Sequence, residues 1–201
     1  DIALSLNRAL ADLGLGAVTE AHVRIWIGRG AARLIEVALQ HVVPHHAQDP
    51  QKHAVEARLL AAFMVRYQDS VCEASTVYPG VAEFVATARA AGIRLACVTN
   101  KPYRPAVALL EALNLLDAFE LVIGGDSLLH KKPHPEPLLH CLRHFEVTAA
   151  QALMVGDSRN DVDAAKAAGV KSLALPYGYN HGEPIEACEP DRLVASLAEL
   201  I

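Results

Sequence analysis

A short apolar run at residues 152–155 is followed by Gly156 and the carboxylate of Asp157. A second carboxylate, Asp161, comes four residues later, where a helical pattern of apolar residues begins. This spacing predicts a buried strand that ends at Gly156 and a helix whose first turn contains Asp161. Because a buried strand that leads into a helix is the repeating unit of a parallel α/β sheet, this stretch constrains the fold more than any other.

Asp157 and Asp161 are candidate metal ligands. In open α/β sheets, ligands bind at the edge formed by the carboxyl ends of the strands. Two carboxylates there, with Arg159 the only basic residue between them, predict a hard oxygen site of the kind that Mg²⁺ prefers. The alternative is structural, because Asp157 could form an Asx turn and Asp161 could cap the helix.

The first part of the chain, residues 1–77, contains only helical patterns. Thr19 is a candidate N-cap, and residues 42–49 are expected to form a loop. Apolar residues at helical spacing predict helices at residues 2–13, 20–27, 31–40 and 51–67. We therefore expect an all-helical domain here.

From residue 78 to the C-terminus, strand and helix patterns alternate, which predicts βαβ units and a parallel sheet. The expected strands are residues 93–98, 121–123, 152–155 and 172–175, with a terminal helix at 192–200. Right-handed crossovers place the carboxyl ends of all these strands at one edge. That edge would collect Thr99, Asn100, Gly125, Asp157 and Pro176.

Composition narrows the classes of function. The chain has 201 residues, 52% of them hydrophobic, and a formal net charge of -5, so neither disorder nor binding to a nucleic-acid backbone is expected. No apolar run reaches membrane-spanning length and no signal peptide is visible. The four cysteines lie far apart without a C-x-x-C pair, which favours reduced thiols in a cytoplasmic protein.

Two further stretches offer groups for binding a phosphoryl group. Thr99, Asn100 and Lys101 follow an expected strand with a hydroxyl, an amide and backbone donors, and Lys132 precedes a proline-stiffened loop. Donors, an ammonium group and a cation held by carboxylates are the combination that phosphoryl transfer requires. As alternatives, Thr99 and Asn100 could only terminate the strand, and Lys132 could be a solvated surface lysine.

The successive runs V-T-N-K, K-K-P-H-P-E-P-L and V-G-D-S-R-N-D resemble motifs two, three and four of the haloacid dehalogenase (HAD) superfamily. Gly28-Arg29-Gly30 and residues 175–182 resemble its phosphoglycolate phosphatase branch. The resemblance implies a Rossmann-like α/β core at residues 78–201 with an all-helical cap at residues 1–77. It also implies Mg²⁺-dependent hydrolysis of a small phosphorylated metabolite by a monomer or homodimer.

The resemblance further implies a role for each matching residue. Thr99 and Asn100 would bind the phosphate, and Lys132 would hold the charges of the nucleophile and the phosphate together. Asp157 and Asp161 would form the metal site, the first as a direct ligand and the second as a holder of the metal's waters.

Substrate contacts are implied as well. Arg29 and Gly30 would reach the substrate from the cap, and Lys101 would contact it from the core. The alternative for Arg29 is a surface residue at the start of a helix.

The first motif of the superfamily, D-x-D-G-T, has no match in these 201 residues. Its first Asp attacks phosphorus and its second protonates the leaving group, so we expect a central strand that carries this motif to precede Asp1 in the natural protein. The expected reaction is then hydrolysis of 2-phosphoglycolate through an aspartyl-phosphate. The alternatives are a phosphosugar phosphatase, for example one acting on N-acetylmuramic acid 6-phosphate, and a non-catalytic phosphate- and metal-binding protein. A metal-independent dehalogenase is disfavoured by the pair of Asp residues.

Overall fold

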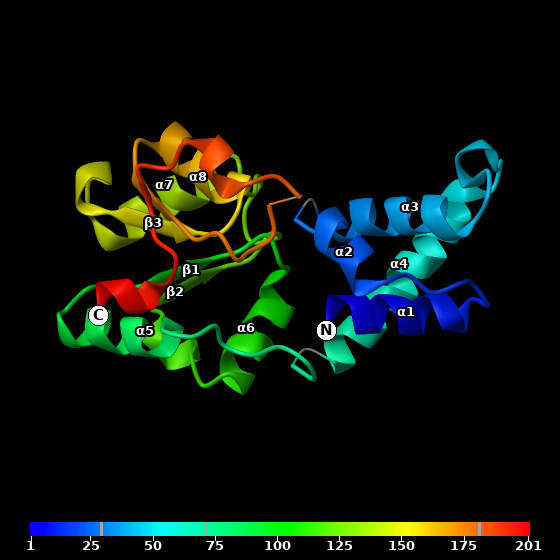
Figure 1. Cartoon of the computed structure of the whole chain (residues 1–201), viewed down its shortest axis with the longest axis horizontal. Helices are drawn as coiled ribbons and strands as arrows, with labels where there is room; N and C mark the ends of the chain where they lie inside the picture. Colours follow the sequence, from blue (N-terminus) through cyan, green and yellow to red (C-terminus); the bar gives the residue numbers. More distant parts are fainter. Residues whose placement is uncertain (29, 71, 181) are drawn as a thin grey trace. The chain divides into compact units, whose positions relative to one another are not determined.

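The computed structural model describes residues 1–28, 30–70, 72–180 and 182–201. They form two compact units, Asp1–Ser75 and Thr76–Ile201, which we call the helical unit and the sheet unit (Figure 1). Among the described residues, all strands belong to the sheet unit, and every strand pair in it is parallel. The α/β class predicted from the sequence is therefore confirmed. No helix in the described part of the chain is both long and apolar enough to cross a membrane.

The helical unit packs its helices around one hydrophobic core. Its elements are α1 (Ile2–Asp12), α2 (Glu20–Trp26), α3 (Ala31–Val42), the 3-10 helix η1 (His46–Gln48) and α4 (Lys52–Asp69). The predicted N-cap is confirmed, because Thr19 Oγ1 accepts a hydrogen bond from the His22 amide at 3.2 Å. Gly28 and Gly30 have φ angles of 105° and 98°, a region that favours glycine because it lacks a Cβ. The centre of this core is formed by fully buried apolar side chains, including Leu6, Leu10, Ile35, Leu39 and Leu59.

The sheet unit alternates strands and helices along the chain. Its elements are α5 (Val81–Ala90), β1 (Ala96–Val98), α6 (Tyr103–Ala112), η2 (Leu116–Ala118), β2 (Leu121–Ile123), α7 (Glu136–Phe145), η3 (Ala149–Gln151), β3 (Leu153–Gly156), α8 (Arg159–Ala168), β4 (Lys171–Ala174), η4 (Ile185–Cys188), β5 (Arg192–Leu193) and η5 (Leu197–Leu200).

Helices cover both faces of the strands. Successive strand residues point to opposite faces of a sheet, and in β3 Met154 packs against a buried cluster on α7 and α8. The next residue, Val155, packs in a different cluster with Val81 and Phe84 of α5. Figure 1 shows the same arrangement, with α7 and α8 on one side of the strands and α5 on the other. The sheet unit is therefore a three-layer αβα sandwich.

The strands form two parallel sheets, whereas the sequence predicted one. In the first, β1 pairs with β2; in the second, the order is β3-β4-β5. Within the described part of the chain, β1 and β3 each keep one edge without a strand partner. Val98 of β1 and Met154 of β3 nevertheless pack against the same cluster on α7 and α8. β1 and β3, each with one edge that has no strand partner in the described part of the chain, therefore both lie against α7 and α8.

The predicted terminal helix at residues 192–200 is wrong. Instead, β5 pairs with β4, with Leu193 opposite Ala174, and the 3-10 helix η5 follows. The carboxylate of Asp191 accepts hydrogen bonds from Lys171 Nζ at 2.6 Å and from the Ser172 amide at 2.9 Å. These contacts fix the start of β5 beside β4, and the apolar residues that suggested a helix pack against the sheet instead.

The charge of Asp191 should stabilise this edge of the sheet. Hydrogen bonds from Lys171 and Ser172 lower the pKa of Asp191 from 3.8 to about 2. Since the folded-state pKa lies below the ordinary value, this stabilisation is complete above about pH 4 and is lost as the pH falls toward 2. We expect Asp191→Asn to lower the Tm at neutral pH and to have no effect near pH 2, as measured by thermal unfolding across that range. A Tm difference that is constant with pH would contradict this role.

Candidate active site

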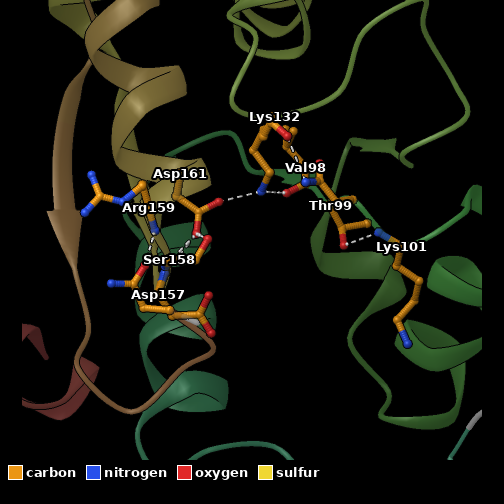
Figure 2. Close-up of polar contacts among 10 residues, drawn as sticks. Val98, Thr99, Lys101, Lys132, Asp157, Ser158, Arg159 and Asp161 are labelled. Carbon is orange, nitrogen blue, oxygen red and sulfur yellow. Dashed lines mark hydrogen bonds and ion pairs between the residues drawn. The ribbon is translucent and has the colours of Figure 1, made fainter. Parts of the chain in front are cut away.

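The candidate site lies in the sheet unit, where β1 and β3 end and the loop before α7 joins them (Figure 2). β1 leads into Thr99, β3 leads into Asp157, and Lys132 comes from the intervening loop. The carboxyl ends of parallel strands meet at one edge of a sheet, which is where ligands bind in such folds.

Lys132 is buried, with 7% of its surface exposed, so it is not the solvated lysine of the structural alternative. Its Nζ donates a hydrogen bond to Asp161 Oδ1 at 2.7 Å and another to the carbonyl oxygen of Val98. A buried ammonium group is tolerated only when it is paired and hydrogen-bonded in this way. Figure 2 shows the amine between the end of β1 and the start of α8. Lys132 therefore links the end of β1 to the first turn of α8.

Asp161 holds the turn between β3 and α8. Its Oδ2 accepts hydrogen bonds from the amides of Asp157 and Ser158, both at 3.0 Å, and from Ser158 Oγ at 3.2 Å. With Ser158 as N-cap, Asp161 completes a capping box, so the helix-cap alternative does occur. A Cβ at position 156 would overlap the Asp161 side chain, which explains Gly156. Because both oxygens are engaged, this geometry favours an indirect role for Asp161 at a metal.

Asp157 carries the carboxylate of the site that is not engaged by another side chain in the described part of the chain. It is half-buried, and no side chain among the described residues pairs with it. Burial and, to a smaller extent, the negative charge of Asp161 raise the pKa of Asp157, and the ammonium of Lys132 lowers it, so that the pKa is about 6 instead of 3.8. In Figure 2 no dashed line joins the Asp157 carboxylate to another side chain. A confined negative charge that forms no ion pair with a protein cation is a position that a bound cation would stabilise.

Thr99 and Asn100 form the turn after β1. The Thr99 hydroxyl oxygen accepts a hydrogen bond from the Lys101 amide at 3.1 Å, so its proton remains available to a ligand. Asn100 Nδ2 donates to the carbonyl oxygen of Lys132 at 2.8 Å and thereby ties two of the site loops together. The Lys101 side chain extends away from Lys132 in Figure 2. Thr99 thus both terminates the strand and offers a hydroxyl donor.

The loop after β4 also reaches the site. The sequence analysis placed Pro176 at this edge but assigned no role there to the residues that follow it. The Leu175 amide continues the strand ladder to Gly156 at 2.9 Å, and Gly178 then packs so closely on Asp157 that a Cβ there would overlap its carboxyl group. Buried Asn180 accepts a hydrogen bond from the Arg159 amide at 2.7 Å. The glycine and amide in the run Y-G-Y-N were the available signal, but they suggested only the family branch.

Gly178→Ala should displace the Asp157 carboxylate, because the added methyl group would meet both its Cβ and its Oδ2. A misplaced catalytic group can cost about 100-fold in rate, so we expect a loss of kcat/KM of that order, measured by steady-state kinetics. Gly16→Ala is the matched control, since nothing lies within 4 Å of a Cβ at that position. Wild-type kinetics in Gly178→Ala would show that the loop does not constrain Asp157.

The described residues fit a Mg²⁺ ion that keeps much of its own hydration. No three His, Cys, Asp or Glu side chains in the described ranges gather into a complete metal site. Mg²⁺ is often held by only one or two carboxylates, with waters and substrate phosphate completing its shell. Asp157, a half-buried carboxylate that forms no ion pair in the described part of the chain, has the donor chemistry for such a site.

The structure brings together most of the residues singled out from the sequence. Thr99, Asn100, Lys132, Asp157 and Asp161 meet at one edge of the sheet unit. Gly30 belongs to the helical unit. Arg29, the other predicted substrate contact there, lies outside the described residues.

Comparison with known proteins agrees with this arrangement. A family model described as haloacid dehalogenase-like hydrolase matches residues 1–175. The phosphoglycolate phosphatase of Nitrosococcus oceani is 40% identical over 200 residues, covering all of this chain and 87% of that protein. The phosphoglycolate phosphatase of Escherichia coli (strain K12) is 39% identical over 212 residues, covering all of this chain and 84% of that protein.

Solved structures show the same fold. A predicted phosphoglycolate phosphatase from Haemophilus somnus 129pt matches with a TM-score of 0.91 and 34% identity, covering 100% of this chain and 88% of that one. CbbY from Rhodobacter sphaeroides in complex with phosphate matches with a TM-score of 0.79 and 29% identity, covering 99% and 88%. The predicted HAD-like fold is therefore confirmed. Relatives that match the whole chain at about 40% identity support an enzyme of the phosphatase type. The chain belongs to the haloacid dehalogenase-like hydrolase family.

Proposed function

We propose that this protein is a Mg²⁺-dependent phosphatase that hydrolyses a small phosphomonoester, with 2-phosphoglycolate as the first candidate. The observation that carries the proposal is the buried Lys132–Asp161 pair beside the unpaired carboxylate of Asp157. This arrangement offers a fixed positive charge and a cation position within one site, as phosphoryl transfer requires. The names of the relatives from N. oceani and E. coli support the choice of substrate.

Each residue has a role in this proposal. The hydroxyl of Thr99 donates a hydrogen bond to a phosphate oxygen, and Asn100 orients the loop of Lys132 through its amide. The Lys132 ammonium offsets the charge of the phosphate and the nucleophile, while Asp161 keeps that ammonium in place. Asp157 holds Mg²⁺, which when bound neutralises charge on the phosphate oxygens.

The nucleophile is proposed to be an Asp on a strand that lies between β1 and β3. Both strands keep an open edge in the described part of the chain, and both pack on α7 and α8. The Lys132 ammonium reaches the carbonyl oxygen at the end of β1, so it would also lie close to the end of an inserted strand. The Asp carboxylate would attack phosphorus and release the alcohol, and water would then hydrolyse the aspartyl-phosphate.

The helical unit is proposed to act as the cap over this centre. Gly28 and Gly30, with their positive φ angles, would allow the Arg29 segment a close approach to the substrate, and Lys101 would contact it from the core. Closure of such a cap excludes water from the first step and reads the organic part of the substrate. The four cysteines are free thiols, which fits a reducing compartment such as the cytoplasm.

A sugar phosphate is the second candidate substrate, because the fold also matches the structure of a mutant form of CbbY from Rhodobacter sphaeroides in complex with xylulose-(1,5)bisphosphate. This match has a TM-score of 0.79 and 28% sequence identity. The deciding experiment compares kcat/KM for 2-phosphoglycolate, N-acetylmuramic acid 6-phosphate, a sugar bisphosphate and a 2-haloacid, each with Mg²⁺ and with EDTA. We expect 2-phosphoglycolate to be preferred by at least about 100-fold, since a site built around a carboxylate-bearing substrate leaves charged groups unpaired with other ligands. Preference for a sugar phosphate would replace the substrate, and metal-independent release of halide would overturn the phosphatase proposal.

A further inference from the structure

The turn after β2 (residues 124–127) packs directly on the turn after β1 (residues 99–102), which carries Thr99 and Asn100. A Cβ at position 125 would overlap the backbone carbonyl group of Asn100, and one at position 124 would overlap the backbone of Tyr103. Only glycine, which has no Cβ, allows two backbones to approach so closely. The two turns are therefore in contact through main-chain atoms.

Two hydrogen bonds join the same two turns. The Gly125 amide donates to the carbonyl oxygen of Lys101 at 2.8 Å, and Asp126 Oδ1 accepts a hydrogen bond from the Tyr103 amide at 2.7 Å. Tyr103 is the first residue of α6, and the preceding Pro102 makes no side-chain cap. Because the first amides of a helix have no partner within it, Asp126 supplies from β2 the acceptor that Pro102 lacks.

These contacts hold the backbone on which the Thr99 hydroxyl depends. Figure 2 shows the Thr99 hydroxyl oxygen accepting the hydrogen bond of the Lys101 amide, at 3.1 Å. The Lys101 carbonyl oxygen is bound by Gly125, so both peptide groups of this residue are fixed. A displacement of the turn after β2 would therefore move the Thr99 hydroxyl with it.

We propose that the turn after β2 positions the phosphate-binding turn after β1, with Gly125 and Asp126 as positioning residues. This inference rests on the proposed phosphate-binding role of Thr99 and adds two residues outside the three sequence motifs. Hydrogen bonds to a phosphate oxygen weaken steeply when the donor is displaced or misaligned. Asp157 follows β3 of the other sheet, so the effect should fall on phosphate affinity and leave Mg²⁺ affinity unchanged.

Gly125→Ala is the variant with the larger expected effect. Its added methyl group would displace the Asn100 carbonyl group and, through the turn, the Thr99 hydroxyl. The measurement is calorimetry with inorganic phosphate at saturating Mg²⁺, together with Mg²⁺ affinity in the absence of phosphate. Since a misplacement of about 1 Å can cost about 100-fold in rate, we expect phosphate affinity to fall at least about 10-fold. Mg²⁺ affinity should match that of the wild type.

Gly80→Ala is the matched control for Gly125→Ala. A Cβ at position 80 would overlap the backbone of Ala198 in η5, so this variant disturbs the same unit at contacts that involve neither turn. It should lower the Tm but leave phosphate affinity unchanged.

Asp126→Ala and Asp126→Asn form a second pair, which decides the question if Gly125→Ala does not fold. Alanine removes the acceptor for the Tyr103 amide, whereas asparagine keeps an oxygen in its place. Loss of a helix cap typically costs about 1 kcal/mol, so we expect phosphate affinity to fall about 3- to 10-fold in Asp126→Ala. Asp126→Asn should restore it, and the KM for 2-phosphoglycolate should follow the same order.

Three outcomes would overturn this inference alone, given normal phosphate binding by the wild type. These are an unchanged phosphate affinity in folded Gly125→Ala or in Asp126→Ala, an equal loss in Asp126→Ala and Asp126→Asn, and a loss in Gly80→Ala as large as that in Gly125→Ala. A wild-type protein that binds Mg²⁺ but no inorganic phosphate would instead overturn the proposed phosphate site, and this inference with it.

Discussion

Lys132→Met is expected to abolish most turnover and to destabilise the sheet unit. The ammonium group of Lys132 is the buried partner of Asp161, and the two lie 2.7 Å apart. Removing one member of a buried ion pair leaves the other charge uncompensated, which costs about 3–5 kcal/mol in the free energy of unfolding. Loss of a fixed charge that stabilises the reacting phosphate should lower kcat by about 100- to 1,000-fold. Chemical denaturation and steady-state kinetics measure the two effects.

Two further variants separate stability from catalysis in this prediction. Lys131→Met alters the adjacent lysine, which is exposed, and should leave both quantities near the wild-type values. The double variant Lys132→Met with Asp161→Asn removes both charges, so it should recover much of the stability but none of the activity. A Lys132→Met protein that unfolds at the wild-type denaturant concentration would show that the buried pair is not the stabilising contact described here.

Asp157→Asn is expected to stabilise the metal-free protein at neutral pH while it eliminates Mg²⁺ binding. The pKa of Asp157 is raised from 3.8 to about 6 by burial and by the charge of Asp161. Since the folded-state pKa exceeds the ordinary value, ionisation of Asp157 destabilises the fold progressively from about pH 4 to about pH 6 and fully above that. A difference of about two pKa units corresponds to about 3 kcal/mol at most, and partial exposure reduces the expected gain to about 1–2 kcal/mol.

Thermal unfolding in EDTA across this pH range measures the gain. The Tm of Asp157→Asn should exceed that of the wild type near neutral pH, and the two should converge near pH 4. Asp117→Asn, which alters an exposed carboxylate in η2, should show no such pH-dependent gain. If Asp157→Asn lowers the Tm of the metal-free protein at neutral pH, its carboxylate has a stabilising partner, and the interpretation as a cation position fails.

Local signals in the sequence were sufficient for most helices of the fold. The cap at Thr19 predicted the start of α2, and the glycine after α8, Gly169, has the left-handed conformation that ends a helix. The pairing of β5 with β4 was not predictable in the same way. It depends on contacts between Asp191 and Ser172, which are separated in sequence, and these override a helical pattern of apolar residues.

Which residues form the site was easier to predict than the hydrogen bonds and contacts among them. Thr99, Lys132 and Asp157 each follow or precede a strand or proline that fixes their place, so their convergence follows from a parallel sheet. The Asp161 carboxylate folds back so that Oδ2 accepts hydrogen bonds from the β3–α8 turn and Oδ1 accepts one from Lys132. This position depends on Gly156, because a Cβ there would overlap the Asp161 side chain. The approach of Gly178 to Asp157 depends on the parallel pairing of β3 with β4, and neither residue type reveals it alone.

The most direct test of the proposed phosphatase centre is a Mg²⁺ titration of phosphate release from 2-phosphoglycolate. The natural protein and its Asp157→Asn variant are compared at the same protein concentration near neutral pH. We expect the natural protein to release phosphate only when Mg²⁺ is present, with saturation, and the variant to fall to the background rate at every Mg²⁺ concentration. Equal rates in EDTA and Mg²⁺, or an Asp157→Asn variant with the wild-type Mg²⁺ response, would contradict the assignment of this site.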